Sequence, residues 1–72
     1  MFMVDFPHLR QKLESLIKNR TGGRVKNLAV QLSPDGVVLE GHTDTFYVKQ
    51  LAQHGVREVL PEAPLQNAIV VA

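Results

Sequence analysis

The three histidines are the side chains of this 72-residue chain best suited to bind a metal or to move a proton near neutral pH. Histidine metal sites need ligands at close, set spacing, such as two histidines three or four residues apart on one helix. His8, His42 and His54 instead fall in three different predicted elements. We therefore interpret them as surface residues and expect no metal site.

Candidates for a catalytic nucleophile are also few. The chain has no cysteine, which excludes a thiolate nucleophile, a disulfide and a thiolate zinc site. Ser15 and Ser33 are the only serines, and neither lies in a strand–turn–helix elbow that would expose a nucleophile. Asp44 lies close to His42, but it is better explained as a helix cap than as an acid–base partner. We expect no enzymatic activity and no cofactor.

Four basic residues near one another in the sequence form the remaining candidate site: Lys18, Arg20, Arg24 and Lys26. Residues 1–32 carry six basic and two acidic residues, a balance of +4. Residues 33–72 carry two basic and five acidic residues, a balance of −3, so the chain has a net charge of +1. A group of cations is suited to contact anionic lipid head groups, at about 1 kcal/mol per residue near a charged surface. The alternative is a solvated rim, and the low total charge argues against nucleic acid as a partner.

Gly22 and Gly23 lie between Arg20 and Arg24, an arrangement that suggests a phosphate-binding loop. Such a loop directs backbone N–H groups at an anion from the start of a helix. Here the two glycines follow a predicted helix and precede a strand, so the helix dipole has the wrong direction. We predict that they form the C-terminal cap of that helix.

The first predicted element is a helix over about residues 6–20. Asp5 is its predicted N-cap, and Pro7 in the first turn loses no needed hydrogen bond. Its apolar residues recur at intervals of three and four and form one stripe, which contains Phe6, Leu9, Leu13, Leu16 and Ile17.

A hairpin is predicted next. Residues 27–32 alternate between apolar and polar side chains, which is typical of a half-buried strand, and the inner face contains Leu28, Val30 and Leu32. Residues 33–36 combine a proline and a glycine in the positions of a tight turn. The second strand covers residues 37–42, and one face of it contains Val37, Leu39 and Gly41.

A second helix is predicted over about residues 45–60, capped by Thr43 or Asp44. Phe46 and Tyr47 are adjacent, so only one of them can face the core fully. We predict core or boundary packing for them, with a role as a partner anchor as the alternative. Small residues within the buried stripe would let the helix lie close to the sheet, and the stripe contains Val48, Leu51, Ala52, Gly55, Val56 and Val59.

Pro61 and Pro64 end this helix, and residues 68–71 are predicted to form a last strand. The order helix, strand, strand, helix, strand predicts one α+β domain over residues 1–72, with a three-stranded mixed sheet and two helices packed on one face. A right-handed crossover makes the last strand parallel to the second. We place it beside the second strand, with a place beside the first as the alternative. The first residues show no signal-peptide pattern, so the chain as written is expected to stay in the cytoplasm.

Three segments, in this order, resemble the BON domain, a small bacterial module: residues 37–43, 51–59 and 67–71. The positions that match the family's pattern are Gly41, Ala52, Val59 and Asn67. Residues 61–66 depart from the pattern, because two prolines loosen the approach to the last strand. The resemblance implies a domain without a reaction of its own, often exported, that contacts phospholipid surfaces or other proteins.

From the residues alone, Gly41 is interpreted as a strand end where a Cβ would clash with the following helix, and Asn67 as a turn residue. The leading hypothesis is a binding module that contacts an anionic phospholipid surface or a protein partner through the four basic residues. The alternative is a structural or self-associating domain, a weak homo-oligomer, that has no lipid ligand.

Overall fold

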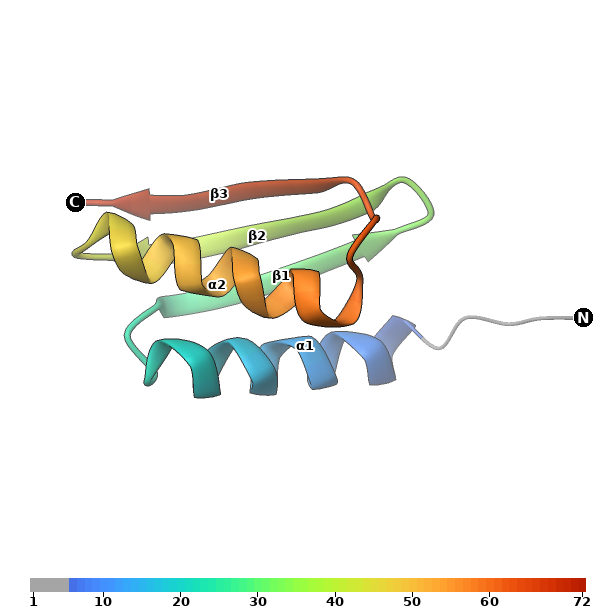
Figure 1. Ribbon diagram of the computed structural model, residues 1–72, viewed down its shortest axis with the longest axis horizontal. Coiled ribbons are helices and arrows are strands. Elements are labelled where there is room, and N and C mark those ends of the chain that lie inside the picture. Colours follow the sequence, from blue (N-terminus) through green and yellow to red (C-terminus); the bar gives the residue numbers. More distant parts are fainter. Residues whose placement is uncertain (1–5) are drawn as a thin grey trace, which may run out of the picture.

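The computed structural model describes residues 6–72. Its elements are α1 (Phe6–Thr21), β1 (Lys26–Ser33), β2 (Gly36–Thr43), α2 (Phe46–Val59) and β3 (Leu65–Val71). The sheet order is β1-β2-β3, with β1 antiparallel and β3 parallel to β2 (Figure 1). This confirms the predicted α+β fold and the place of the last strand beside the second. The alternative place beside the first strand is wrong, and the predicted N-cap Asp5 lies outside the described residues.

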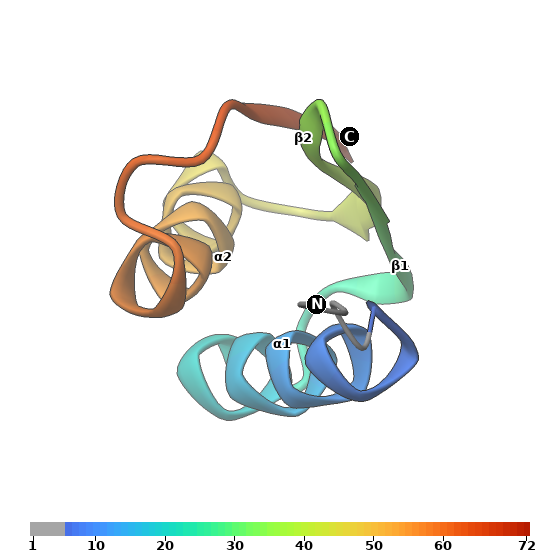
Figure 2. The same ribbon diagram turned by 90° about the vertical axis from the view of Figure 1, so that its right-hand side faces the viewer.

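Both helices cover the same face of the sheet, as predicted (Figure 2). The alternation in the hairpin brings Val30, Val37 and Leu39 to this face, where all three are buried. Burial of the helical stripes completes one continuous core, whose other members are Leu13, Ile17, Val25, Val48, Ala52, Val56 and Ile69. Removing this apolar surface from water is the main source of stability in a domain of this size.

The end of α1 has the predicted glycine cap. Gly22 and Gly23 have φ values of 62° and 72°, which glycine adopts without a Cβ clash. The Gly23 amide donates to the carbonyl of Lys18 at 3.0 Å and so satisfies one of the last carbonyls of the helix. The chain can therefore reverse direction within a few residues and enter β1.

The start of α2 differs from the prediction. Thr45 is the N-cap, and its hydroxyl accepts a hydrogen bond from the Val48 amide at 3.2 Å. Thr43, one of the two predicted caps, is instead the buried last residue of β2. The other, Asp44, has an exposed side chain that faces Arg24. Three neighbouring residues have cap-forming side chains, and local sequence does not decide between them.

One small residue of α2, Gly55, has a different neighbour from the one expected. A Cβ added to Gly55 would lie 3.5 Å from Ile17 Cγ1 of α1, so Gly55 lets the two helices approach each other. Leu51 is half-buried rather than part of the core, because it lies about 100° around the helix from Ala52. The buried face of α2 is narrower than predicted and consists of Val48, Ala52, Gly55 and Val56.

Strand β3 begins three residues earlier than the predicted residues 68–71. Val37 donates its amide to the Pro64 carbonyl at 2.9 Å, and Leu65 then pairs with Val37 as the first of seven parallel pairs. Arg57 fixes the preceding connection, because its Nη1 donates to the Ala63 carbonyl at 2.5 Å and to the Pro61 carbonyl at 3.3 Å. The prediction missed this part of the strand because Gln66 and Asn67 are polar and interrupt the apolar run on which it was based.

Candidate functional site

The four basic residues of the candidate site do not form one cluster. Arg20 turns away from the others and pairs with Glu58 in the last turn of α2, with Nε 2.7 Å from Oε2. The hydrogen bond from Arg20 is the main reason why the pKa of Glu58 lies below its ordinary value. Arg20 therefore links the two helices, and its charge is largely matched by a carboxylate.

The other three basic residues remain exposed at the end of the domain where α1 and β2 end and α2 begins (Figure 1). Arg24 lies 3.7 Å from Asp44, a long contact in which both side chains are more than half exposed. Within the described residues, Lys18 and Lys26 form no ion pair. This surface thus keeps an excess of positive charge.

A hollow of about 440 Å³ lies at this end of the domain. Its lining comes from three separate parts of the chain, which the fold brings together. The lining residues are Gly23, Arg24, Lys26, His42, Thr43, Asp44 and Ala72. The Thr43 hydroxyl is buried and has no hydrogen-bond partner among the described residues. We call the exposed surface of Lys18, Arg24, Lys26 and His42 the basic end.

Phe46 and Tyr47 open α2 beside the basic end, and both are exposed. Their relative exposures are 62% and 65%, so the predicted core or boundary packing is wrong for both. The Lys49 ammonium lies 5.8 Å from the centre of the Phe46 ring, in cation–π contact. The sequence could have predicted this exposure from the buried stripe of Val48, Ala52 and Val56. At 100° per residue around the helix, both aromatic residues fall outside that stripe.

Gly41, Ala52 and Val59, which match the pattern of the BON family, lie in the packed interior of the domain or against it. Gly41 has a φ of 149°, and a Cβ there would lie 2.8 Å from Val25 Cγ1 and 3.0 Å from the Lys26 carbonyl oxygen. The clash is thus with the chain entering β1, not with the helix that follows, as had been expected. Ala52 is fully buried, and Val59 packs against the core from the last turn of α2.

Asn67 lies within β3 and is not a turn residue. Its Nδ2 donates to the Lys49 carbonyl at 2.9 Å, and its Oδ1 accepts from the Ile69 amide at 3.3 Å. The expected local backbone contact is therefore present, but the longer-range one ties α2 to the sheet. Sequence reasoning missed this contact because the acceptor is a backbone carbonyl 18 residues away.

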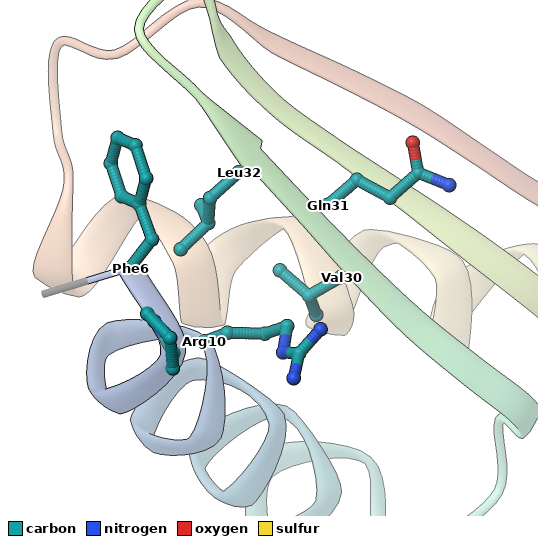
Figure 3. A pocket seen from close by; sticks show the side chains of 6 residues that line it. Phe6, Arg10, Val30, Gln31 and Leu32 are labelled. Atoms are coloured by element: carbon teal, nitrogen blue, oxygen red, sulfur yellow. The ribbon is translucent and has the colours of Figure 1, made fainter.

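A second hollow, of about 300 Å³, opens between the start of α1 and β1 (Figure 3). The side chains of Phe6, Val30 and Leu32 make most of its wall, with Arg10 below Val30, whereas Gln31 points away from them (Figure 3). An apolar wall with a single guanidinium offers neither a base nor a nucleophile. It therefore adds no catalytic candidate.

The acidic side chains and histidines of the described residues are spread over the domain. In residues 6–72 no three His, Asp or Glu side chains come together as a metal-binding group. His8, His42 and His54 lie on α1, β2 and α2 respectively. Over the same residues, neither helix has the length and apolar character needed to cross a bilayer.

Comparisons of the chain with protein-family models, with curated proteins and with solved structures give no significant match. The resemblance to the BON family therefore stays a prediction. It is carried by the sequence patterns of residues 37–43, 51–59 and 67–71.

Proposed function

We propose that this chain is a non-enzymatic binding module that docks its basic end on an anionic phospholipid surface. The observation that carries the proposal is the exposure of Phe46 and Tyr47 at the start of α2, next to Lys49 and at the end of the domain that carries Arg24 and Lys26. Aromatic rings flanked by cations suit the boundary between head groups and acyl chains, because the rings enter the apolar layer while the cations stay at the phosphates. The resemblance to the BON family points the same way.

The energetics decide which residues matter most. Lys18, Lys26 and Lys49 contribute about 1 kcal/mol each near an anionic surface, and Arg24 contributes less because Asp44 partly neutralises it. About 3–4 kcal/mol corresponds to only millimolar affinity. Burial of one aromatic ring adds about 1.5–3 kcal/mol. Phe46 and Tyr47 together therefore make the difference between millimolar and roughly micromolar binding.

A protein partner is the second candidate for the same surface. Exposed tyrosine and phenylalanine next to basic side chains are also enriched at the centres of protein interfaces. The salt dependence and the lipid dependence of binding separate the two candidates, since a protein partner gives no reason for affinity to follow vesicle charge.

The experiment is vesicle flotation with the full chain. Vesicles that contain phosphatidylglycerol should carry the protein to the top of the gradient, whereas vesicles of phosphatidylcholine alone should not. Phe46→Ser with Tyr47→Ser should remove binding while circular dichroism shows a native fold, because both side chains are exposed. Lys12→Glu changes a cation that is exposed on α1 outside the basic end, so it should reduce binding far less than the double serine variant does. Equal recovery with anionic and neutral vesicles at low salt would refute the lipid proposal and favour the protein partner.

A further inference from the structure

The two edges of the sheet differ in how they are protected. Edge strands expose unpaired backbone groups, and proteins usually block them with charges, bulges or a covering element. Strand β1 has such devices: its register with β2 shifts between Lys26 and Ala29, and Asn27 in this irregular stretch has a positive φ of 56°. Strand β3 has a regular seven-residue register and contains neither a charged residue nor a proline.

Hydrogen bonds at its two ends show which backbone groups of β3 face outward. Ala72 donates its amide to the Thr43 carbonyl at 3.0 Å, and the Pro64 carbonyl accepts from Val37 at 2.9 Å. The direction of these groups alternates along a strand, so the even-numbered residues face β2. The N–H and C=O groups of the odd-numbered residues face the open edge, and these residues are Leu65, Asn67, Ile69 and Val71.

Within the described residues, the hydrogen bond that these outward groups make is the one from the Ile69 amide to Asn67 Oδ1. At 3.3 Å this bond is longer than a standard N–H···O bond, so exchanging it for a backbone carbonyl costs little. Val70 and Val71 are also exposed, at 50% and 38%. The edge thus combines free backbone groups with apolar side chains.

We propose that β3 pairs antiparallel with β3 of a second copy of this chain, about a two-fold axis at Ala68, to form a six-stranded sheet. In this register Asn67 pairs with Ile69 of the second copy, and Leu65 pairs with Val71 of the second copy. Every outward-facing residue of β3 then exchanges both backbone hydrogen bonds with its counterpart. The two Ala68 residues meet on the axis, where their small side chains allow the close approach of a non-hydrogen-bonded pair.

The chemistry of the strand favours a second copy over an unrelated partner. An interface about a two-fold axis must be complementary to itself, and a strand without charges brings no like charges together. The contact is one strand wide, so it falls in the class of small interfaces below about 1,200 Å² and predicts a weak, concentration-dependent dimer. Antiparallel pairing sends the two basic ends to opposite ends of the dimer. Dimer formation therefore does not depend on lipid binding, and either one can be absent while the other is present.

The test uses the residues that the register sets opposite each other on the open sheet face, Gln66 and Val70 of the second copy. Both side chains are exposed, so charges there should leave the fold intact. Gln66→Lys with Val70→Lys places like charges across the axis and should weaken the dimer about tenfold. Gln66→Glu with Val70→Lys places opposite charges there and should strengthen it by a similar factor. The lysine at position 70 is common to both variants, so each is the matched control of the other.

The measurement is sedimentation of the full chain up to about 1 mM, the range expected for a small interface. The proposal requires a monomer–dimer equilibrium that shifts in opposite directions in the two variants. A wild-type chain that stays monomeric throughout would overturn it. A dimer that both variants weaken equally would also overturn it, because that result assigns the contact to another surface or register.

Discussion

Arg20 in the last turn of α1 and Glu58 in the last turn of α2 form a two-pronged ion pair. Nε lies 2.7 Å from Oε2, and Nη2 lies 2.5 Å from Oε1. The contact spans 38 positions of sequence and closes the helix–helix interface next to Gly55, whose missing side chain leaves room for the Arg20 stem. Arg20, which was predicted to be part of a ligand-binding surface, thus connects the two helices.

The first prediction is a contribution of this pair to acid sensitivity. Hydrogen bonding by Arg20 lowers the pKa of Glu58 in the folded state relative to the unfolded state. The contribution is therefore fully present above the ordinary glutamate pKa of about 4.3 and is lost as the pH falls through the lower pKa of the folded state. Urea titrations at a series of pH values should show a shallower acid loss of stability for Glu58→Gln than for the wild type.

Both side chains are nearly half exposed, so solvent screens the pair and the difference should be modest. Glu14→Gln, on the same helix as Arg20 but outside this pair, is the control for the loss of one acidic group. Identical acid profiles for wild type and Glu58→Gln would show that the pair does not persist in solution.

The second prediction is that two leucines, which the sequence analysis assigned to the core in the same way, contribute differently to the free energy of unfolding. Leu39 is fully buried at the centre of β2, so Leu39→Ala should cost about 2–5 kcal/mol, much of the stability of a small domain. Leu51 is only partly buried and is not a member of the core, so Leu51→Ala should cost only about 1 kcal/mol. Equilibrium denaturation measures both changes, and equal losses would mean that the orientation of α2 is wrong.

The third prediction concerns Gly41. Its φ of 149° is unfavourable for residues with a Cβ, and that Cβ would meet Val25 and the Lys26 carbonyl. Gly41→Val should therefore lower the melting temperature strongly, because both the backbone and the chain entering β1 must shift. Gly22→Ala is the comparison that isolates the steric part, since Gly22 also has a positive φ but open space around it. A Gly41→Val protein as stable as Gly22→Ala would contradict the packing role.

Local sequence was sufficient to predict most of the fold. The helix of residues 6–20, the hairpin turn and the α1 cap depend on periodicity and on proline and glycine chemistry within a few residues, and the structure has all three. The early start of β3 was missed because parallel pairing with β2 is not local, and because the polar Gln66 and Asn67 occupy the strand.

The candidate site was harder to predict for a related reason. The role of Arg20 depends on Glu58, and the roles of Arg57 and Asn67 depend on backbone carbonyls, which every residue has and no pattern marks. Phe46 and Tyr47 look like core residues by composition, and only their angle relative to the stripe of α2 places them in solvent. Residue type thus identified the charges but not their partners.

The last prediction uses Arg20 and Lys26 to separate folding from lipid binding. Arg20→Glu would place two carboxylates together beside Glu58, so it should lower stability while vesicle binding per folded molecule changes little. Lys26→Glu removes an unpaired cation from the basic end, so it should leave stability within about 0.5 kcal/mol and weaken binding.

Flotation with anionic vesicles and thermal melts, measured on the same samples, give the two quantities. Binding of the wild type should also fall steeply between low salt and about 0.1 M salt, where exposed charges are screened beyond about 10 Å. The loss on Lys26→Glu should be largest at low salt, because screening removes the same interaction that the substitution removes. If Arg20→Glu abolishes binding in a fully folded protein while Lys26→Glu has no effect, the docking surface lies on the helix pair and not at the basic end.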